Sequence, residues 1–352
     1  MTNTAKIGMF IDMAKVSITD VAAEAHVAIS TASKALNGTG SIGKDTVERV
    51  MAAAKRLGYR PNRAAQMLAG KQKKIGILIP DFPDQIISCF EAGIADAMEE
   101  YASFGFRHTL FRYDNRTQGD AAFFDGLELF ARKELVDGLI FTPSCVSSVC
   151  RDRLMQLSIP KLSLQIRADP TICTSVTVDE PMVGRMAAEF LSLFGTIRST
   201  GVIVGERNIA IHKMNLEGYA SEAAARGLEL TAIADSYNDM NTAYNETESM
   251  LQNFPQIQGI FVSSYVAPAV CSCIRDRGKA GDIRVIGVDV YKETAECLAC
   301  GLLSAIIYQN QREQGRQSIR QMVSLLLDEP TESIRIKPEL VMNCNLSFYY
   351  TP

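Results

Sequence analysis

The sequence predicts a small all-α head followed by a larger α/β body, whose parallel sheets form two lobes. Three observations support this fold class. Apolar residues recur at helical spacing through residues 17–57. From residue 74 onward, strand-like apolar runs alternate with helical segments, and about ten such runs suggest two sheets. A chain of 352 residues is also long enough for roughly two to three domains.

The charge of the chain is divided between these two parts. Residues 1–74 contain twelve Lys or Arg and five Asp or Glu, a net charge of +7. Because the whole chain carries −4, the remaining residues carry −11. A basic head on an acidic body is expected when one end binds a polyanion, although a solvated surface gives the same pattern. Sequence motifs are therefore needed to distinguish polyanion binding from a solvated surface.

The head is predicted to contain three helices. Ser17 and Asp20 form a variant of the capping box, which opens the first helix. His26 and Val27 form a short turn before a second helix at about residues 29–36, and a third helix spans 44–57. Two short helices joined by such a turn form a DNA-reading unit, whose second helix enters the major groove.

The loop after the second helix contains a motif that also occurs in dinucleotide-binding proteins. Gly38, Gly40 and Gly43 have the spacing GxGxxG. In a nucleotide-binding fold this motif follows a strand, whereas here it follows a predicted helix. A loop between two helices of the head is therefore the preferred interpretation.

Three sequence runs carry a family resemblance. They are TDVAxxAxV, TxSxxLNG and LGYxPNRxAxxLAGK, and together they cover the head as far as residue 71. The head resembles the lactose-repressor/galactose-repressor (LacI/GalR) family of bacterial transcription regulators. The resemblance implies a helix-turn-helix DNA-binding domain, a hinge helix, and a two-lobed, type I periplasmic-binding-protein-like core that binds an effector and forms a homodimer.

The resemblance also implies domain boundaries. Residues 1–15 are an N-terminal extension, 16–60 the DNA-binding domain, 61–73 the hinge helix or linker, and 74–352 the core. Within the core, lobe 1 is expected at about 74–174 and 309–337, and lobe 2 at about 175–308 and 338–352. The chain would then cross between the lobes three times.

Base-reading positions of the family fall on Ile29, Ser30 and Lys34. Lysine can donate to guanine acceptors, serine can bond to several bases, and isoleucine can lie against a thymine methyl group. The chain departs from the family at His26, where glycine is usual, at Ala28, where serine is usual, and at Lys34, where arginine is usual. The full set of expected DNA-binding residues is Ile29, Ser30, Thr31, Ser33, Lys34, Asn37, Tyr59, Asn62, Arg63, Gln66 and Leu68.

The stretch opened by Pro61 and closed by Gly70 is expected to be a conditional helix. An isolated helix shorter than roughly 12 to 15 residues is marginal in water, so this one should order only when docked. The resemblance implies that it lies in the minor groove beside its copy from the partner subunit, with Leu68 wedged into a base step. A simple tether between domains is the alternative interpretation.

Effector-binding candidates follow the predicted strands of the body. Parallel sheets bind ligands outside the carboxyl ends of their strands, where several polar residues stand. The resemblance assigns effector contacts to Asp289 and Gln309, and it places Asn215 where an arginine is usual. Ser263 and Ser264 replace a usual Asn-Asp pair, and Ile86 and Ile87 replace a usual aromatic pair. The absence of the arginine and of the aromatic pair favours a small polar metabolite, such as a polyol, pentose or sugar acid derivative, over an ordinary hexose. The expected effector-binding residues are Asp81, Asn215, Ser263, Asp289 and Gln309.

Several other classes of function are disfavoured. Nine scattered cysteines suit reduced thiols, and the pairs Cys271/Cys273 and Cys297/Cys300, which would fit zinc by spacing, lie in apolar, helix-like segments. We therefore expect no metal and no cofactor. No apolar run suggests a membrane span, and no export signal is recognised, so a cytoplasmic location is expected. The motifs GxSxG and HExxH and the P-loop are absent, which disfavours an enzyme.

The sequence thus predicts a homodimeric transcription regulator, most simply a repressor. Its expected partners are a near-palindromic double-stranded DNA operator and a small-molecule effector. The alternative is a solute-binding protein without a DNA role, which would require export and would leave the basic head without a use.

Overall fold

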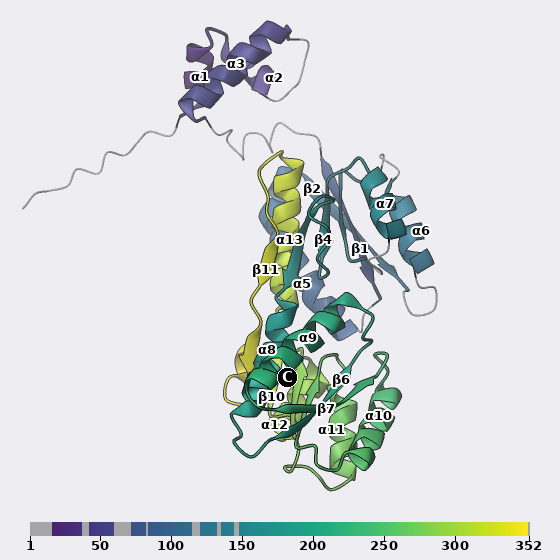
Figure 1. Ribbon diagram of the computed structural model, residues 1–352. Helices are drawn as coiled ribbons and strands as arrows, with labels where there is room; N and C mark the ends of the chain where they lie inside the picture. Colours follow the sequence, from purple (N-terminus) through teal and green to yellow (C-terminus); the bar gives the residue numbers. More distant parts are fainter. Residues whose placement is uncertain are drawn as a thin grey trace, which may run out of the picture. The chain divides into compact units, whose positions relative to one another are not determined.

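The computed structural model describes residues 16–36, 42–59, 72–81, 84–114, 120–131, 135–143 and 148–350. The chain divides into two compact units, residues 1–72 and 73–352 (Figure 1). The N-terminal extension, most of the expected hinge and the candidates Asn37, Asn62, Arg63, Gln66 and Leu68 lie outside the described residues.

The head contains the three predicted helices, α1 (Ile18–Glu24), α2 (Ile29–Leu36) and α3 (Lys44–Leu57). The capping box is confirmed: the Asp20 amide donates to Ser17 Oγ over 3.4 Å, and the Ser17 amide donates to the Asp20 carboxylate over 2.8 Å. Val21, Ala32 and Val50, one from each helix, are fully buried at the centre of the head. Small side chains at these contacts allow three short helices to close a core.

The turn between α1 and α2 has an unusual backbone conformation. His26 has a φ of 53°, in the left-handed region that favours glycine. Its side chain is exposed, and its amide donates to the Ala23 carbonyl over 3.1 Å. The backbone therefore keeps the left-handed turn although the sequence has a histidine there.

The first sheet of the body is parallel throughout, in the order β11-β5-β4-β3-β1-β2. Helices α5 (Asp84–Tyr101) and α13 (Gln311–Leu326) pack together, and α13 also contacts β3, β4 and β5. The strands are β1 (Lys73–Pro80), β2 (Phe106–Tyr113), β3 (Gly138–Phe141), β4 (Lys161–Leu164), β5 (Thr174–Val178) and β11 (Ile334–Ile336); α6 (Asp120–Ala131), α7 (Ser148–Gln156) and the 3-10 turn η1 (Ala102–Phe104) complete this lobe.

The second sheet has the order β12-β10-β9-β8-β6-β7, and only β12 runs antiparallel to its neighbour. Helices α8 and α9 pack in one buried cluster with this sheet, and α10, α11 and α12 pack in another. The elements are β6 (Ser199–Val204), β7 (Glu229–Asp235), β8 (Gly259–Val262), β9 (Arg284–Val288), β10 (Ala305–Tyr308), β12 (Glu339–Val341), α8 (Glu180–Ser192), α9 (Ala210–Ala225), α10 (Met240–Asn253), α11 (Ala267–Asp276), α12 (Lys292–Ala299) and the 3-10 turn η2 (Leu346–Phe348).

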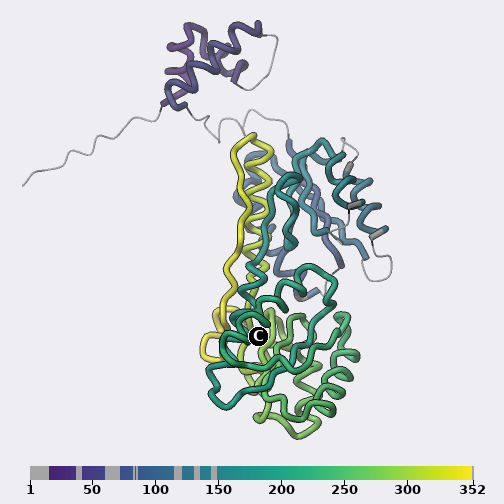
Figure 2. The backbone as a smooth tube through the Cα atoms, viewed as in Figure 1, coloured from purple at the N-terminus to yellow at the C-terminus, as the bar shows by residue number. Residues whose placement is uncertain are grey.

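The chain passes three times between the two sheets, as Figure 2 lets the reader follow. The crossings lie between β5 and α8, between β10 and α13, and between β11 and β12. The first crossing was expected near residue 174, and this position is wrong. Residues Thr174–Val178 form β5, which pairs with β4 and β11 in the first sheet, so the crossing follows Val178.

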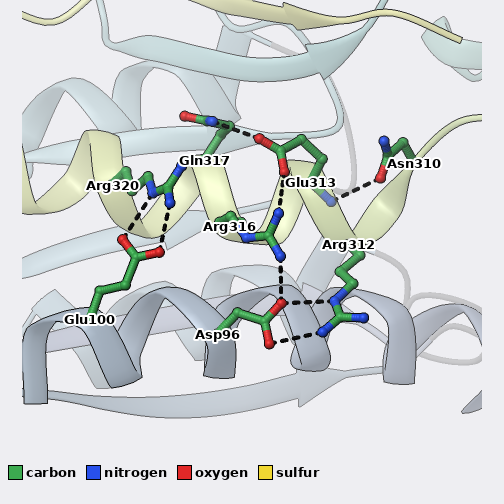
Figure 3. A network of polar contacts seen from close by, with 8 residues as sticks. All are labelled: Asp96, Glu100, Asn310, Arg312, Glu313, Arg316, Gln317 and Arg320. Carbon is green, nitrogen blue, oxygen red and sulfur yellow. Dashed lines mark hydrogen bonds and ion pairs between the residues drawn. The ribbon is translucent and has the colours of Figure 1, made fainter.

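Helices α5 and α13 approach each other closely because a glycine faces the contact. A Cβ atom added to Gly93 would lie 1.8 Å from the Arg312 carbonyl oxygen. Arginines of α13 then bind carboxylates of α5: Arg312 and Arg316 donate to Asp96, and Arg320 donates to Glu100 (Figure 3). The hydrogen bonds from Arg312 and Arg316 lower the pKa of Asp96 to about 2.

Candidate DNA-binding surface and effector site

The outer face of α2 is the candidate DNA-reading surface. Ala32 and Ala35 turn inward and are buried, whereas Ser30 and Lys34 are exposed and Ile29 is 50% exposed. These three outward residues are the predicted base readers. Thr31 and Ser33 are partly buried beside them. The helix therefore offers a short polar and apolar surface of the size that a major groove admits.

Tyr59 lies just beyond α3 and packs partly buried against the core of the head. Gly58, with a φ of 64°, ends the helix in the left-handed conformation, and the Tyr59 amide donates to the Ala54 carbonyl over 2.9 Å. Tyr59 thus has a structural role, and its predicted contact with DNA stays a prediction.

The candidate effector site lies at the carboxyl edge of the second sheet. In the sheet, β6 lies between β7 and β8. Helix α9 precedes β7 in the chain and α10 follows it, and these two helices pack in different buried clusters. The strand order therefore reverses at β6, and such a switch point is where open α/β sheets bind ligands. Ser263, Asp289 and Gln309 directly follow the neighbouring strands β8, β9 and β10, so the topology brings these three predicted residues together.

Asp289 is the only carboxylate in this row of strand ends, and it is 7% exposed. Its Oδ1 accepts hydrogen bonds from Gln309 Nε2, at 3.0 Å, and from Gln311 Nε2. Burial raises the pKa of Asp289 to about 6, although the bonds from Gln311 and Gln309 act in the opposite direction. Asp289 and Gln309, which the sequence assigned to one site, are thus direct partners.

Gln311 was not predicted as part of the site. It is the first residue of α13, the helix that packs on the first sheet, so its bond to Asp289 spans a crossing between the lobes. The backbone is strained on both sides of this contact, because Asp289 has a φ of 64° and Asn310 a φ of 52°. Strain of this kind is common at ligand sites. The three consecutive amide side chains at residues 309–311 were the sequence feature that could have indicated Gln311 as a site residue.

Three buried polar atoms of the second lobe have no hydrogen-bond partner in the described structure. They are Ser263 Oγ and Ser264 Oγ, directly after β8, and Asn215 Oδ1 on α9, where the Asn215 backbone faces Gly184 of α8; the three residues are 1 to 4% exposed. Native proteins rarely leave such groups unpaired. These atoms therefore offer hydrogen-bonding capacity that a polar ligand would satisfy.

His212 joins two of the strand ends and was also missed. Its Nδ1 lies 3.2 Å from the Ser263 carbonyl oxygen, which can only accept, so Nδ1 carries the proton and Nε2 is an acceptor when the ring is neutral. Burial lowers the pKa of His212 to about 4. A Cβ atom at Gly205 would lie 2.2 Å from His212 Nε2 and 2.5 Å from Asn238 Oδ1. Glycine after β6 thus makes room for both side chains.

Two tyrosines connect the loops around the site. Tyr265 Oη donates to the Asn238 carbonyl over 2.6 Å, and Tyr291 Oη donates to the Tyr265 carbonyl. These bonds link the loops that follow β7, β8 and β9. The loop positions therefore depend on one another, which gives the edge of the sheet a defined shape.

Asp81 occupies a different edge. It follows β1 at the carboxyl end of the first sheet, is exposed, and its amide donates to the Tyr113 carbonyl over 2.9 Å. None of its described contacts joins it to the residues of the second sheet. A role for Asp81 in the effector site stays a prediction.

The residues that the structure describes form no group of three or more His, Cys, Asp or Glu side chains able to hold a metal ion. Two cations of this lobe lie beside carboxylates. Arg207 binds Asp235, and Lys213 lies 3.9 Å from Glu217. In the described part of the chain, no helix combines the length and apolar character that a membrane span requires.

Known proteins resemble both parts of the chain. Residues 75–330 match the periplasmic binding protein domain, and residues 17–62 match the lacI family of bacterial regulatory proteins. The ribose operon repressor of Halalkalibacterium halodurans is 28% identical over 78% of this chain and 80% of its own length. Catabolite control protein A of Staphylococcus epidermidis is 27% identical over 76% of this chain and 75% of its own length.

A solved structure extends the comparison to the fold of the body. An ABC transporter solute binding protein from Bacillus halodurans with bound myo-inositol has a TM-score of 0.71 and 20% identity, over 79% of this chain and 97% of that protein. The predicted fold class is confirmed by these matches together with the two sheets. With its helix-turn-helix head and its periplasmic-binding-protein body, the chain belongs to the lacI family of bacterial regulatory proteins.

Proposed function

We propose that the chain is a cytoplasmic, homodimeric repressor without enzymatic activity, and that a small polar effector sets its affinity for a near-palindromic DNA operator. The observation that carries the proposal is the exposed face of α2 on a three-helix head, in the same chain as a buried polar site at a sheet switch point. A DNA reader and a ligand site in one chain suit a regulator that responds to a metabolite.

The charges of the site support an effector that is not an anion. The buried polar groups of the site are the Asp289 carboxylate, hydroxyls and amides, and Arg207, a cation of the same lobe, is bound to Asp235. A phosphate or carboxylate would enter beside a buried acid without a partner of opposite charge, which is costly. A polyhydroxyl compound, such as a sugar or polyol, would instead donate hydrogen bonds to these acceptors. The name of the ribose operon repressor is consistent with this class.

Homodimerisation is proposed because a helix-turn-helix protein reads a palindromic operator as a symmetric pair. The hinge predicted at residues 61–73 would order when two copies lie side by side on DNA. An effector that changes the spacing of the two hinges would then change the affinity for the operator.

The decisive experiment is selection of bound sequences from a random DNA pool by the purified protein, with and without candidate sugars and polyols. We expect two symmetric half-sites around a central deformable step. Enrichment of no sequence under either condition would contradict the regulator function. It would favour the second candidate, a solute-binding protein, which the fold of the body alone supports.

A further inference from the structure

The hydrogen bond between Gln311 and Asp289 joins the two lobes. Asp289 follows β9 in the second lobe, and Gln311 is the first residue of α13, which packs on the first sheet. The two residues are only 4% and 7% exposed. Asp289 Oδ1 accepts from Gln311 Nε2 and also from Gln309 Nε2. Two donors fill the usual capacity of a carboxylate oxygen, so a further donor reaches Oδ1 only by replacing one of them.

Of these two donors, Gln311 is the one that belongs to the other lobe. Asp289 is fixed within the second lobe, because its amide donates to the Ile307 carbonyl over 3.0 Å and its carbonyl accepts from Thr294 Oγ1 over 2.9 Å. Gln309 directly follows β10 of the same sheet. A movement of one lobe against the other would therefore break the bond from Gln311 first.

Helix α13 extends from this bond to the place where the body begins (Figure 1). With 16 residues it is about 24 Å long. Its last turns lie directly on Gly138, where an added Cβ atom would be 2.5 Å from Met322 Sδ and 3.3 Å from Leu326 Cδ2. Gly138 is the first residue of β3 and pairs with Ile75 of β1. The far end of α13 thus packs beside the start of β1.

The residue before Gly138 holds the first residues of the body. The Asp137 amide donates to the Lys74 carbonyl over 2.7 Å, and the Lys74 amide donates to Asp137 Oδ2 over 2.8 Å. Asp137 Oδ1 also lies 3.8 Å from Lys73 Nζ. Lys73 is the first residue of the compact body, so the chain that leads to the head joins here. Because close-packed interiors transmit displacement, a shift of α13 would act on this attachment point.

We propose that the Asp289–Gln311 bond is a latch between the lobes, which the effector releases and which α13 connects to the start of β1. Its release rests on the proposed function, in which an effector binds at Asp289. In the ligand-free protein the latch holds the first turn of α13 to the second lobe. A hydroxyl group of the effector replaces the Gln311 amide on Asp289, and α13 then moves with the first lobe. The affinity for DNA changes because the attachment point of the head moves too.

The test uses the ligand-free, full-length protein and a matched pair of variants. Gln311→Met removes the amide that bonds to Asp289 and keeps an unbranched side chain of similar length. Gln317→Met makes the same change further along α13, where Gln317 Nε2 donates to Glu313 Oε1 of the same helix. Hydrogen exchange, measured by mass spectrometry, should be at least about tenfold faster in the first two turns of α13 for Gln311→Met only. Exchange in the peptide of residues 73–80 should also be faster.

A second comparison shows whether this effect depends on Asp289. In an Asp289→Ala protein the latch has lost its acceptor, so adding Gln311→Met should cause no further increase in exchange. A general loss of helix stability would instead appear with and without Asp289. Additive effects of the two substitutions would therefore overturn the proposal, and so would equal exchange in Gln311→Met and Gln317→Met. Circular dichroism shows that each variant is folded.

Operator binding separates the latch from the proposed function. With a DNA site obtained by selection and no effector present, Gln311→Met should change the affinity by at least about fivefold relative to Gln317→Met. Altered exchange with equal affinities would overturn the connection from α13 to the head. If selection yields no DNA site, the proposed function fails, whereas the exchange measurement still decides whether the latch exists.

Discussion

At the scale of single residues, Asp289 carries the largest conflict between burial and charge in the candidate site. Its carboxylate is buried in the row of strand ends, and two glutamine amides only partly replace the water it has lost. Its backbone is left-handed, a conformation that asparagine and aspartate tolerate better than most residues. Both features cost stability in the free protein, and a ligand that donates to the carboxylate would offset part of that cost.

We therefore expect Asp289→Asn to stabilise the free protein at pH 7, by on the order of 2 kcal/mol. The folded-state pKa of about 6 lies above the usual aspartate value of 3.8. Ionisation of Asp289 therefore destabilises the fold increasingly as the pH rises between these two values, and it has its full effect above pH 6. Asparagine keeps Oδ1 for the two glutamines but does not ionise. Urea unfolding of the wild type and of the variant at pH 7 and near pH 4 tests this prediction. The difference in unfolding free energy between the two proteins should be smaller at low pH. An equal difference at both pH values would contradict the prediction.

His26 is a second residue with a conformational cost, because a non-glycine residue in the left-handed region loses about 1 kcal/mol. We expect His26→Gly to slow hydrogen exchange of the α1 and α2 amides, measured by mass spectrometry. Because the His26 side chain is exposed, little packing would be lost. His26→Ala keeps the backbone cost and is the matched control. Equal exchange in the two variants would show that the turn does not limit the stability of the head.

At the scale of elements, the contact between α5 and α13 shows how backbone approach and ion pairing support each other. Gly93 lets the helices come close, and the arginines of α13 then reach Asp96 and Glu100 on α5 (Figure 3). The first turn of α13 also contains Gln311, the partner of Asp289. One helix therefore connects the effector site with the packing of the first lobe.

Gly93→Ala should destabilise the body by at least about 1 to 3 kcal/mol, the usual cost of overpacking, because its Cβ would meet backbone that cannot move aside freely. Thermal unfolding of the full-length protein measures the effect. Gly195→Ala is the matched control, since a Cβ there meets no atom within 4 Å. Similar unfolding temperatures for both variants would mean that the helices separate at little cost.

The sequence predicted elements well where the signal was local, and less well where the chain had to cross between lobes. The head helices follow from a cap, a turn and apolar spacing, all within residues 17–57. Strands β11 and β12 have three residues each, too few for a periodic pattern. His212 and Gln311 reach the site only through the tertiary fold, and neither stands at a strand end. Asp289 and Gln309 were accessible to prediction because each directly follows a strand.

At the scale of the whole molecule, charge separates the part proposed to bind DNA from the part proposed to bind the effector. The first 74 residues carry +7 and the rest −11. The acidic body should repel DNA and the basic head should attract it, so that nonspecific binding depends strongly on salt. We propose that specific recognition comes from side chains on α2, together with the predicted hinge residues.

We expect Lys34→Ala to weaken operator binding by about 1 to 3 kcal/mol and to reduce the preference for the operator over a scrambled duplex, since Lys34 is a proposed base reader. Fluorescence anisotropy with both duplexes at several salt concentrations measures affinity and preference. Lys213→Ala, an exposed lysine of the body, is the control and should bind DNA as the wild type does. Loss of affinity without loss of preference would instead assign Lys34 to phosphate contacts.

The three crossings have a consequence for how the gene can be divided. A fragment ending after α13 would lack β11 and β12, and so one edge strand from each sheet. Neither lobe corresponds to one continuous stretch of codons. A lobe expressed as a single continuous fragment would therefore lack a segment that belongs to its sheet. A reporter domain is therefore better inserted into a surface loop within one lobe than fused to a truncated body, because only the former keeps both sheets whole.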